Sequence, residues 1–174
     1  MDEFGSATII DDSVQLLVLD CFDTLVELDG DNYRLRQGVA AFLKHYGERV
    51  GLPMVVLSDA EGPTLLRVLA HTGLTPWFKA LYYAPESVAP DANGVLHKRL
   101  DHPLRDFHVK PEQALFIGDS KLDAQAAQRY GLGFIRVPGS ADRDFTFTRL
   151  IKGPSRYRSE EYTTRMLKRY QTPE

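Results

Sequence analysis

The sequence contains a single cysteine, Cys21, in 174 residues. One cysteine cannot form a disulfide within the chain, so the disulfide framework of a small secreted protein is excluded. No stretch approaches the ~20 consecutive apolar residues that a membrane-spanning helix requires. The opening residues, MDEFGSATIIDDS, are acidic, whereas a secretory signal peptide begins with basic residues. We therefore expect a soluble cytoplasmic protein that has no membrane partner.

Internal repeats, low-complexity tracts and long linkers are also absent. With 43% hydrophobic residues, a chain of 174 residues can build one domain with a substantial core but not two. The net charge is −3, yet residues 149–174 hold seven Lys/Arg and only three Glu. An acidic body with a basic tail is not the charge distribution of a general nucleic-acid binder. We predict a single domain over residues 1–148 and a basic helical tail over residues 149–174.

The tail carries a narrow apolar stripe, because Tyr162, Met166 and Tyr170 recur every four residues. Such a stripe most often packs on its own domain. It could instead dock on a second subunit and partly cover that subunit's site. A homo-oligomer that forms through the tail is therefore one expectation.

Apolar runs of strand length alternate with stretches of helical spacing along the rest of the chain. The predicted strands span 14–20, 53–58, 79–84, 114–119 and 133–138, and the predicted helices span 36–51, 62–73 and 121–131. This alternation predicts the α/β class, as a Rossmann-like three-layer α/β/α domain with a central parallel sheet.

Polar side chains follow three of the predicted strands, and in open parallel sheets ligands bind beyond the carboxyl ends of the strands. These clusters are Asp20 with Asp23 and Thr24, Ser58 with Asp59, and Asp119 with Asp123 in GDSKLD. Carboxylates from neighbouring strand ends can share a Mg²⁺ ion, and Asp20 with Asp119 is the obvious pair. Asp123 begins the next helix and can turn back toward the same ion. Ser58 can donate a hydrogen bond to a phosphate oxygen.

In order, these stretches resemble the signatures of the haloacid dehalogenase superfamily, most of whose members are Mg²⁺-dependent phosphatases that work through an aspartyl-phosphate. The resemblance runs from about residue 14 to 137 and comprises LLVLDCFDTL, VVLS, a lysine and ALFIGDSKLD. Each signature alone is weak, but the ordered set is strong. The lysine that fits the order best is Lys98, in GVLHKRLDHPL, rather than Lys110 or Lys121.

The resemblance implies a role for each of these residues. Asp20, four residues before Thr24, would be the nucleophile that attacks phosphorus. Mg²⁺ would be the cofactor, and the implied metal set is Asp20, Phe22, Asp119 and Asp123. The implied substrate contacts are Thr24, Ser58, Asp59 and Lys98, and the implied catalytic set is Asp20, Asp23 and Lys98.

The first signature departs from the family pattern, which expects an aspartate two residues after the nucleophile as general acid and base. This chain has Phe22 there, and Asp23 stands where the family usually has glycine. General acid–base catalysis contributes roughly 10² to 10⁴ in rate, so its loss matters most for poor leaving groups. Relatives that cleave carbon–halogen bonds need no proton at this step. Alternatively, one helical turn would bring Asp23 onto the same side as Asp20 as a replacement proton donor.

The intervals between the signatures, 24–58 and 58–98, leave little room beyond a flap and core elements, so we predict no cap domain and an open site. Such a site would suit a macromolecular phosphorylated substrate. Alternatively, a second subunit would cover the site. We expect a Mg²⁺-dependent phosphate monoester hydrolase. The alternatives are a catalytically impaired phosphate-binding or scaffold protein and, less favoured without a lid, a dehalogenase-type hydrolase.

Several of these residues also have purely structural interpretations. For Asp59 we favour capping of the helix that follows it. Asp123 could be an acid that the helix dipole favours at a helix N-terminus. Lys98 could be a solvated lysine, and Cys21 a small buried apolar side chain.

Overall fold

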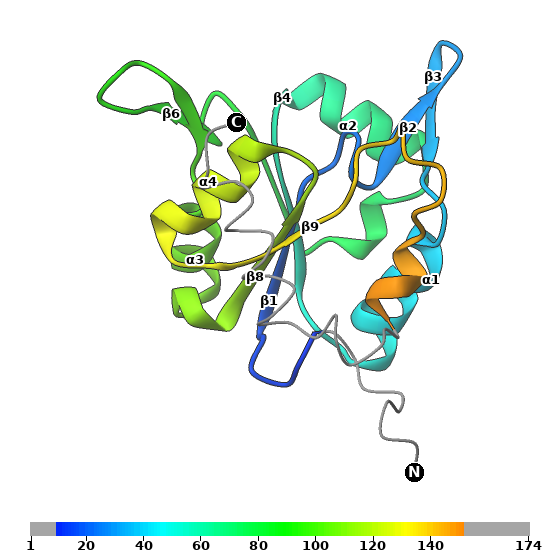
Figure 1. Ribbon diagram of the computed structural model, residues 1–174, viewed down its shortest axis with the longest axis horizontal. Coiled ribbons are helices and arrows are strands. Elements are labelled where there is room, and N and C mark those ends of the chain that lie inside the picture. Colours follow the sequence, from blue (N-terminus) through cyan, green and yellow to red (C-terminus); the bar gives the residue numbers. More distant parts are fainter. Residues whose placement is uncertain (1–9, 152–174) are drawn as a thin grey trace.

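Five parallel strands form the central sheet in this computed structural model, which describes residues 10–151. The strand order is β5-β4-β1-β8-β9 (Figure 1). The strands are β1 (Leu16–Leu19), β4 (Met54–Glu61), β5 (Ala80–Ala84), β8 (Ala114–Gly118) and β9 (Gly133–Arg136). All four pairings between neighbours are parallel, which confirms the predicted sheet. The predicted tail and its apolar stripe lie outside the described residues, apart from residues 149–151.

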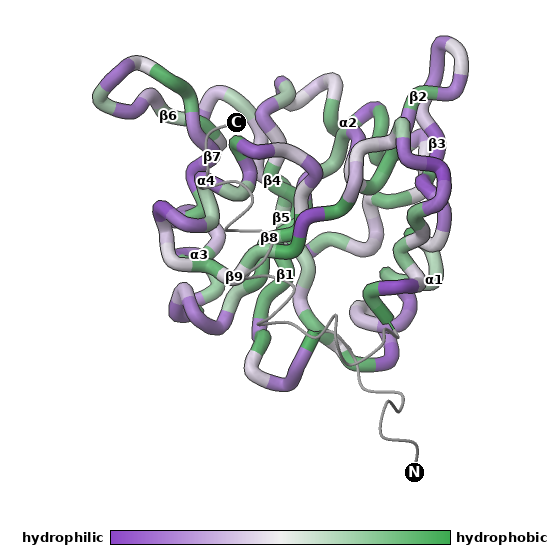
Figure 2. The backbone as a smooth tube through the Cα atoms, viewed as in Figure 1, coloured by the Kyte–Doolittle hydropathy of each residue, from purple (hydrophilic) through white to green (hydrophobic). Residues whose placement is uncertain are grey.

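Strand β1 shows why the sequence LLVL forms a central strand: all four of its residues are buried. Alternate side chains of a strand point to opposite faces, so a strand covered on both faces must be apolar throughout. Leu17 and Leu19 belong to one apolar cluster, and Leu16 and Val18 belong to a second on the other face. The core is therefore divided in two by the sheet. The apolar strands of this sheet lie at the centre of Figure 2.

The helices form the two outer layers (Figure 1). Buried residues of α1 (Val39–Leu43) and α2 (Gly62–His71) pack in the first cluster. Residues of α3 (Asp101–Phe107) and α4 (Lys121–Tyr130) pack in the second. This arrangement confirms the three-layer α/β/α fold.

The predicted helix over 36–51 is shorter and less regular than expected. It starts only after Gly38, whose φ of 82° is left-handed, and a π-helical segment over Lys44–Arg49 follows α1. The predicted helix over 121–131 matches α4, which ends at Gly131 with a left-handed φ of 79°. Glycine adopts this conformation without steric cost, which explains both boundaries.

The predicted capping role of Asp59 is wrong. Strand β4 continues to Glu61, and it is Glu61 that occupies the N-cap position of α2. The strand extends because β4 resumes its pairing with β5 at Glu61↔Ala84, after an irregularity that follows Leu57. This second stretch of pairing depends on β5 and leaves no mark in the sequence of β4.

Two hairpins project from the sheet edge where the strands end (Figure 1). The first, β2 (Val26–Asp29) with β3 (Asn32–Leu35), is the predicted flap. The second, β6 (Val88–Pro90) with β7 (Leu96–Lys98), was not predicted. Within residues 10–151, neither interval between the signatures holds a separate lid domain. None of the described helices is long and apolar enough to cross a membrane.

Gly38 and Gly30 make a matched test of the turn that starts α1. Both have left-handed φ values, of 82° and 63°, but a Cβ at Gly38 would lie 2.8 Å from the amide nitrogen of Thr148, whereas a Cβ at Gly30 would meet nothing. We expect Gly30→Ala to cost about 1 kcal/mol of unfolding free energy, from backbone strain alone. Gly38→Ala should cost about 3 kcal/mol, because overpacking is added to that strain. Denaturant titration of both variants measures the difference, and equal losses would contradict the close approach.

Candidate active site

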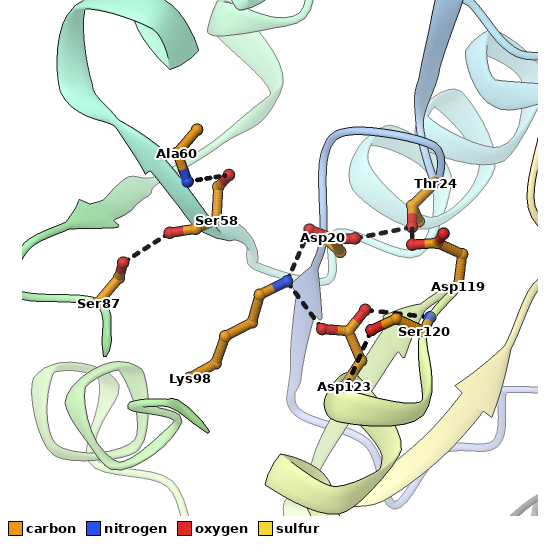
Figure 3. A network of polar contacts seen from close by, with 9 residues as sticks. All are labelled: Asp20, Thr24, Ser58, Ala60, Ser87, Lys98, Asp119, Ser120 and Asp123. Carbon is orange, nitrogen blue, oxygen red and sulfur yellow. Dashed lines mark hydrogen bonds and ion pairs between the residues drawn. The ribbon is translucent and has the colours of Figure 1, made fainter. Parts of the chain in front are cut away.

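The ammonium of Lys98 lies between two carboxylates at the carboxyl edge of the sheet (Figure 3). Its Nζ is 2.8 Å from Oδ1 of Asp20, which directly follows β1, and 2.8 Å from Oδ1 of Asp123, in α4. The Phe116 ring centroid lies 5.6 Å from the same nitrogen. Lys98 is only 9% exposed, so its interpretation as a solvated lysine is wrong.

Thr24 links the loop after β1 to the end of β8. Its Oγ1 lies 3.0 Å from Asp20 Oδ2 and 3.0 Å from Asp119 Oδ1, and the hydroxyl can donate to one of them at a time. The main-chain amide of Thr24 donates to the carbonyl of Cys21, which closes the loop. Both oxygens of Asp20 are thus held, one by Lys98 and the other by Thr24.

Asp123 has a structural function as well as its place beside Lys98. Its main-chain amide donates to Ser120 Oγ, and its Oδ2 accepts from the Ser120 amide, which completes a capping box at the start of α4. The predicted position at a helix N-terminus is therefore confirmed. Gly118 makes room for this carboxylate, because a Cβ there would lie 2.8 Å from Asp123 Cγ.

Burial dominates the electrostatics of the site. Desolvation raises the pKa of Asp20 well above its usual value, and the Lys98 ammonium offsets this only in part. For Lys98, burial alone would lower the pKa, but the charges of Asp20 and Asp123 outweigh it and raise the pKa above the normal lysine value. Lys98 therefore stays charged at neutral pH.

The acidic residues also form a candidate cation site. Oxygens from Asp20, Asp119 and Asp123 lie within 4.8 Å of one another. The cluster holds three carboxylates and Lys98 pairs with two of them, so a divalent cation would offset the remaining negative charge. Carboxylate oxygens are the ligands that Mg²⁺ prefers, and these residues fit such an ion. Phe22, also in the predicted metal set, could offer only its main-chain carbonyl, because its side chain is apolar.

The side chains of Phe22 and Asp23 make contacts with residues outside the Lys98 network. The ring of Phe22 packs edge-on against Tyr33 of the flap, at 5.1 Å between centroids. Asp23 is exposed, and its Oδ1 accepts a 2.8 Å hydrogen bond from Ser140 Oγ. The φ of Asp23 is 58°, which is left-handed, so the loop does not form the right-handed helical turn that would place Asp23 beside Asp20.

Ser58 is fully buried on β4, the strand next to β1 (Figure 3). Its Oγ accepts from the Ala60 amide at 3.1 Å, and its carbonyl accepts from Ser87 Oγ at 2.6 Å. Asp59 is exposed one residue further on. Ser87 was not among the predicted site residues, because nothing in the sequence links a serine just before the second hairpin to Ser58.

Comparison with known proteins agrees with this geometry. Residues 7–131 match the haloacid dehalogenase-like hydrolases. The chain belongs to this family. A haloacid dehalogenase-like hydrolase from Streptococcus pneumoniae shares the fold, with a TM-score of 0.59 and 15% identity over 75% of this chain and 90% of that one.

Two curated members of the family are similar in sequence, and both are named phosphoglycolate phosphatase. The one from Rhodobacter capsulatus is 32% identical over 109 residues, which are 63% of this chain and 47% of that protein. The one from Thiobacillus denitrificans is 26% identical over an aligned length of 170, and the alignment covers 83% of this chain and 71% of that protein. The chain thus spans about half the length of the first relative and more of the second.

Cys21 tests the burial of the loop beside Asp20 in this hydrolase. Burial first, and then the charge of Asp20, raises the pKa of its thiol to about 12. A thiol reacts as the thiolate, and raising the pKa by this amount reduces the thiolate fraction by about 10³ at mildly alkaline pH. We expect a thiol reagent to label the denatured chain rapidly and the folded chain at least about 10³ times more slowly. Rapid labelling of the folded protein would show that the loop is open to solvent.

Proposed function

We propose that the protein is a Mg²⁺-dependent phosphate monoester hydrolase that works through an aspartyl-phosphate on Asp20. The observation that supports this most directly is the fixing of both Asp20 oxygens. Lys98 Nζ lies 2.8 Å from Oδ1, and Thr24 Oγ1 lies 3.0 Å from Oδ2. A carboxylate held in this way is oriented for attack and loses little freedom on reaching the transition state.

In the proposed reaction, an oxygen of Asp20 forms a bond to phosphorus while the bond from phosphorus to the leaving oxygen breaks. Water then attacks the aspartyl-phosphate, which releases phosphate and regenerates the carboxylate. Lys98 would hold its charge throughout and stabilise the negative charge on the transferring group. Ser58, buried on the neighbouring strand, would donate to a phosphate oxygen through its hydroxyl.

Asp20, Asp119 and Asp123 would hold Mg²⁺, together with the main-chain carbonyl of Phe22. The bound ion would neutralise their excess negative charge and polarise a phosphate oxygen. The residues themselves keep the site rigid, since Thr24 ties Asp20 to Asp119, and the capping box with Ser120 fixes Asp123. These contacts keep the three carboxylates in place despite their mutual repulsion.

A catalytically impaired phosphate-binding or scaffold protein is the second candidate. It is favoured by one observation: the Phe22 ring packs on Tyr33, and the neighbouring Asp23 is hydrogen-bonded to Ser140. The Phe22 side chain has no proton to donate, and the Asp23 carboxylate already accepts a hydrogen bond from Ser140. Such a protein would bind phosphate at the same residues but would not form a covalent intermediate.

The first prediction for this function concerns the nucleophile. Asp20→Asn should abolish turnover of p-nitrophenyl phosphate, because the amide has nearly the same shape but is almost non-nucleophilic. Circular dichroism should show an intact fold. Asp31→Asn, an exposed substitution at the flap tip, is the control and should retain full activity. Wild-type rates in Asp20→Asn would refute the assignment.

The second prediction concerns the leaving group. Without a proton donor, the wild-type protein should cleave p-nitrophenyl phosphate but leave alkyl phosphates nearly untouched. Phe22→Asp should raise the alkyl rate relative to the aryl rate by about 10² or more. The ratio of the two rates cancels any loss of folded protein.

Asp23→Asn distinguishes the remaining cases in the same assay. If Asp23 is the proton donor, alkyl phosphates already turn over, and this variant loses that activity by about 10². For the scaffold candidate, mass spectrometry should detect phosphate binding but no phosphorylated Asp20 with either ester. Equal aryl and alkyl rates that Asp23→Asn leaves unchanged would mean that the proton donor lies elsewhere.

A further inference from the structure

Arg36 lies at the base of the flap, immediately after β3, and is only 5% exposed. Its Nη1 donates to the carbonyl of Asp23 at 2.7 Å and lies 3.4 Å from the carbonyl of Thr24. Its Nη2 donates to the carbonyl of Gly139 at 3.3 Å. All three acceptors are uncharged main-chain oxygens, so this buried guanidinium is not used to neutralise a carboxylate in direct contact.

The carbonyls that Arg36 binds come from two segments far apart in the chain. Asp23 and Thr24 belong to the loop that follows Asp20, and Gly139 belongs to the segment after β9. The same segment supplies Ser140, whose hydroxyl donates to the Asp23 carboxylate. It also supplies Phe145, whose ring centroid lies 5.5 Å from Arg36 Cζ. Arg36 therefore joins the loop after Asp20 to the segment that follows β9.

Keeping a guanidinium at this position has a cost. Burial lowers the pKa of Arg36, and the carboxylates of Glu27 and Asp119 offset this only at longer range. The planar fork of arginine places two nitrogens in a fixed geometry, and here each nitrogen bonds a different segment, whereas a lysine would have to make these contacts from one nitrogen on a shorter side chain. The contacts of Arg36 are thus those of a residue that holds two segments in position, not of one that neutralises a carboxylate.

Asp23 shows what the loop requires. Its φ of 58° is unfavourable for any residue except glycine, although Asp tolerates it better than most. Three contacts hold it there: its amide donates to Val26, its carbonyl accepts from Arg36, and its carboxylate accepts from Ser140. Strained conformations persist where surrounding contacts over-determine them.

We propose that Arg36 is a positioning residue that fixes the loop over residues 21–26 and, through Thr24, the orientation of Asp20. The chain of contacts is short: Arg36 holds the main chain at Asp23 and Thr24, and the Thr24 hydroxyl lies 3.0 Å from a carboxylate oxygen of Asp20 and of Asp119. For its effect on turnover, this inference rests on the proposed function. Its effect on the loop is independent of that function.

Amide hydrogen exchange tests the loop directly. The amides of Asp23, Thr24, Leu25 and Val26 all donate to carbonyls within the loop. In Arg36→Ala these amides should exchange at least about tenfold faster, while those of Phe116 and Ile117 in β8 stay protected. Arg34→Ala is the matched control, because Arg34 is half exposed and pairs with Glu27 on the flap. It should leave the loop unchanged.

Added guanidinium ion provides a rescue. A cavity of about 290 Å³, lined in part by Arg34, Ser140 and Arg143, already opens beside Arg36, so the ion can reach the space that Arg36→Ala vacates. Millimolar guanidinium should restore loop protection in Arg36→Ala. In the active enzyme, kcat should fall about 10² in Arg36→Ala with KM little changed, and guanidinium should recover part of it. Arg36→Lys should remain impaired, because the shorter lysine side chain has one nitrogen where Arg36 uses two in a fixed geometry.

The outcomes separate cleanly. Unchanged loop exchange in Arg36→Ala would overturn the proposal, as would equal acceleration in the loop and in β8, since that would mean global destabilisation. Full protection and full kcat in Arg36→Lys would also overturn it, because charge alone would then suffice. If wild-type protein hydrolyses no ester, the proposed function fails, but the exchange and rescue measurements still decide the role of Arg36.

Discussion

The buried ammonium of Lys98 is the interaction on which the candidate site depends. The carboxylates of Asp20 and Asp123 both lie 2.8 Å from Lys98 Nζ at the carboxyl edge of the sheet. Without a cation there, their charges would repel one another in a region shielded from water. Removing one partner of a buried pair typically costs about 3–5 kcal/mol, because the other charge is left uncompensated. Lys98 is 78 residues from Asp20 in the chain and ends the short strand β7. The second hairpin therefore matters chiefly because it delivers this side chain.

The sheet provides the other half of the arrangement. Strand β1 lies between β4 and β8, and the pairing of Leu19 with Ile117 brings both strands to an end at the same level. The carboxyl groups that follow must then converge, since Asp20 leaves β1 as its amide still donates to the carbonyl of Ile117. Gly118 completes the approach by leaving space for Asp123. A parallel register and one missing Cβ are enough to gather these acids.

The sequence predicts the features that depend on short-range pattern. The continuous apolar run of β1 identified a strand buried on both faces, and the order of the signatures was enough to select Lys98 from three lysines. The sequence does not predict features that depend on pairing or contact with a distant segment. The extension of β4 past Asp59 is set by its second pairing with β5, and the contacts of Ser140 with Asp23 span 117 residues without any distinctive motif.

A residue at position 22 can contribute to the site through its main-chain carbonyl and through its side chain, and Phe22 differs from the aspartate of the family pattern only in the second. A main-chain carbonyl is the same in Phe and Asp, so the exchange leaves any contribution of the backbone to a cation intact. The side chain, in contrast, has no acidic group and packs on Tyr33 of the flap. Asp23, the carboxylate next in sequence, accepts a hydrogen bond from Ser140 and so helps to hold the loop. For the proposed reaction, these contacts therefore bear on protonation of the leaving group and not on the residues proposed to bind the ion and phosphate.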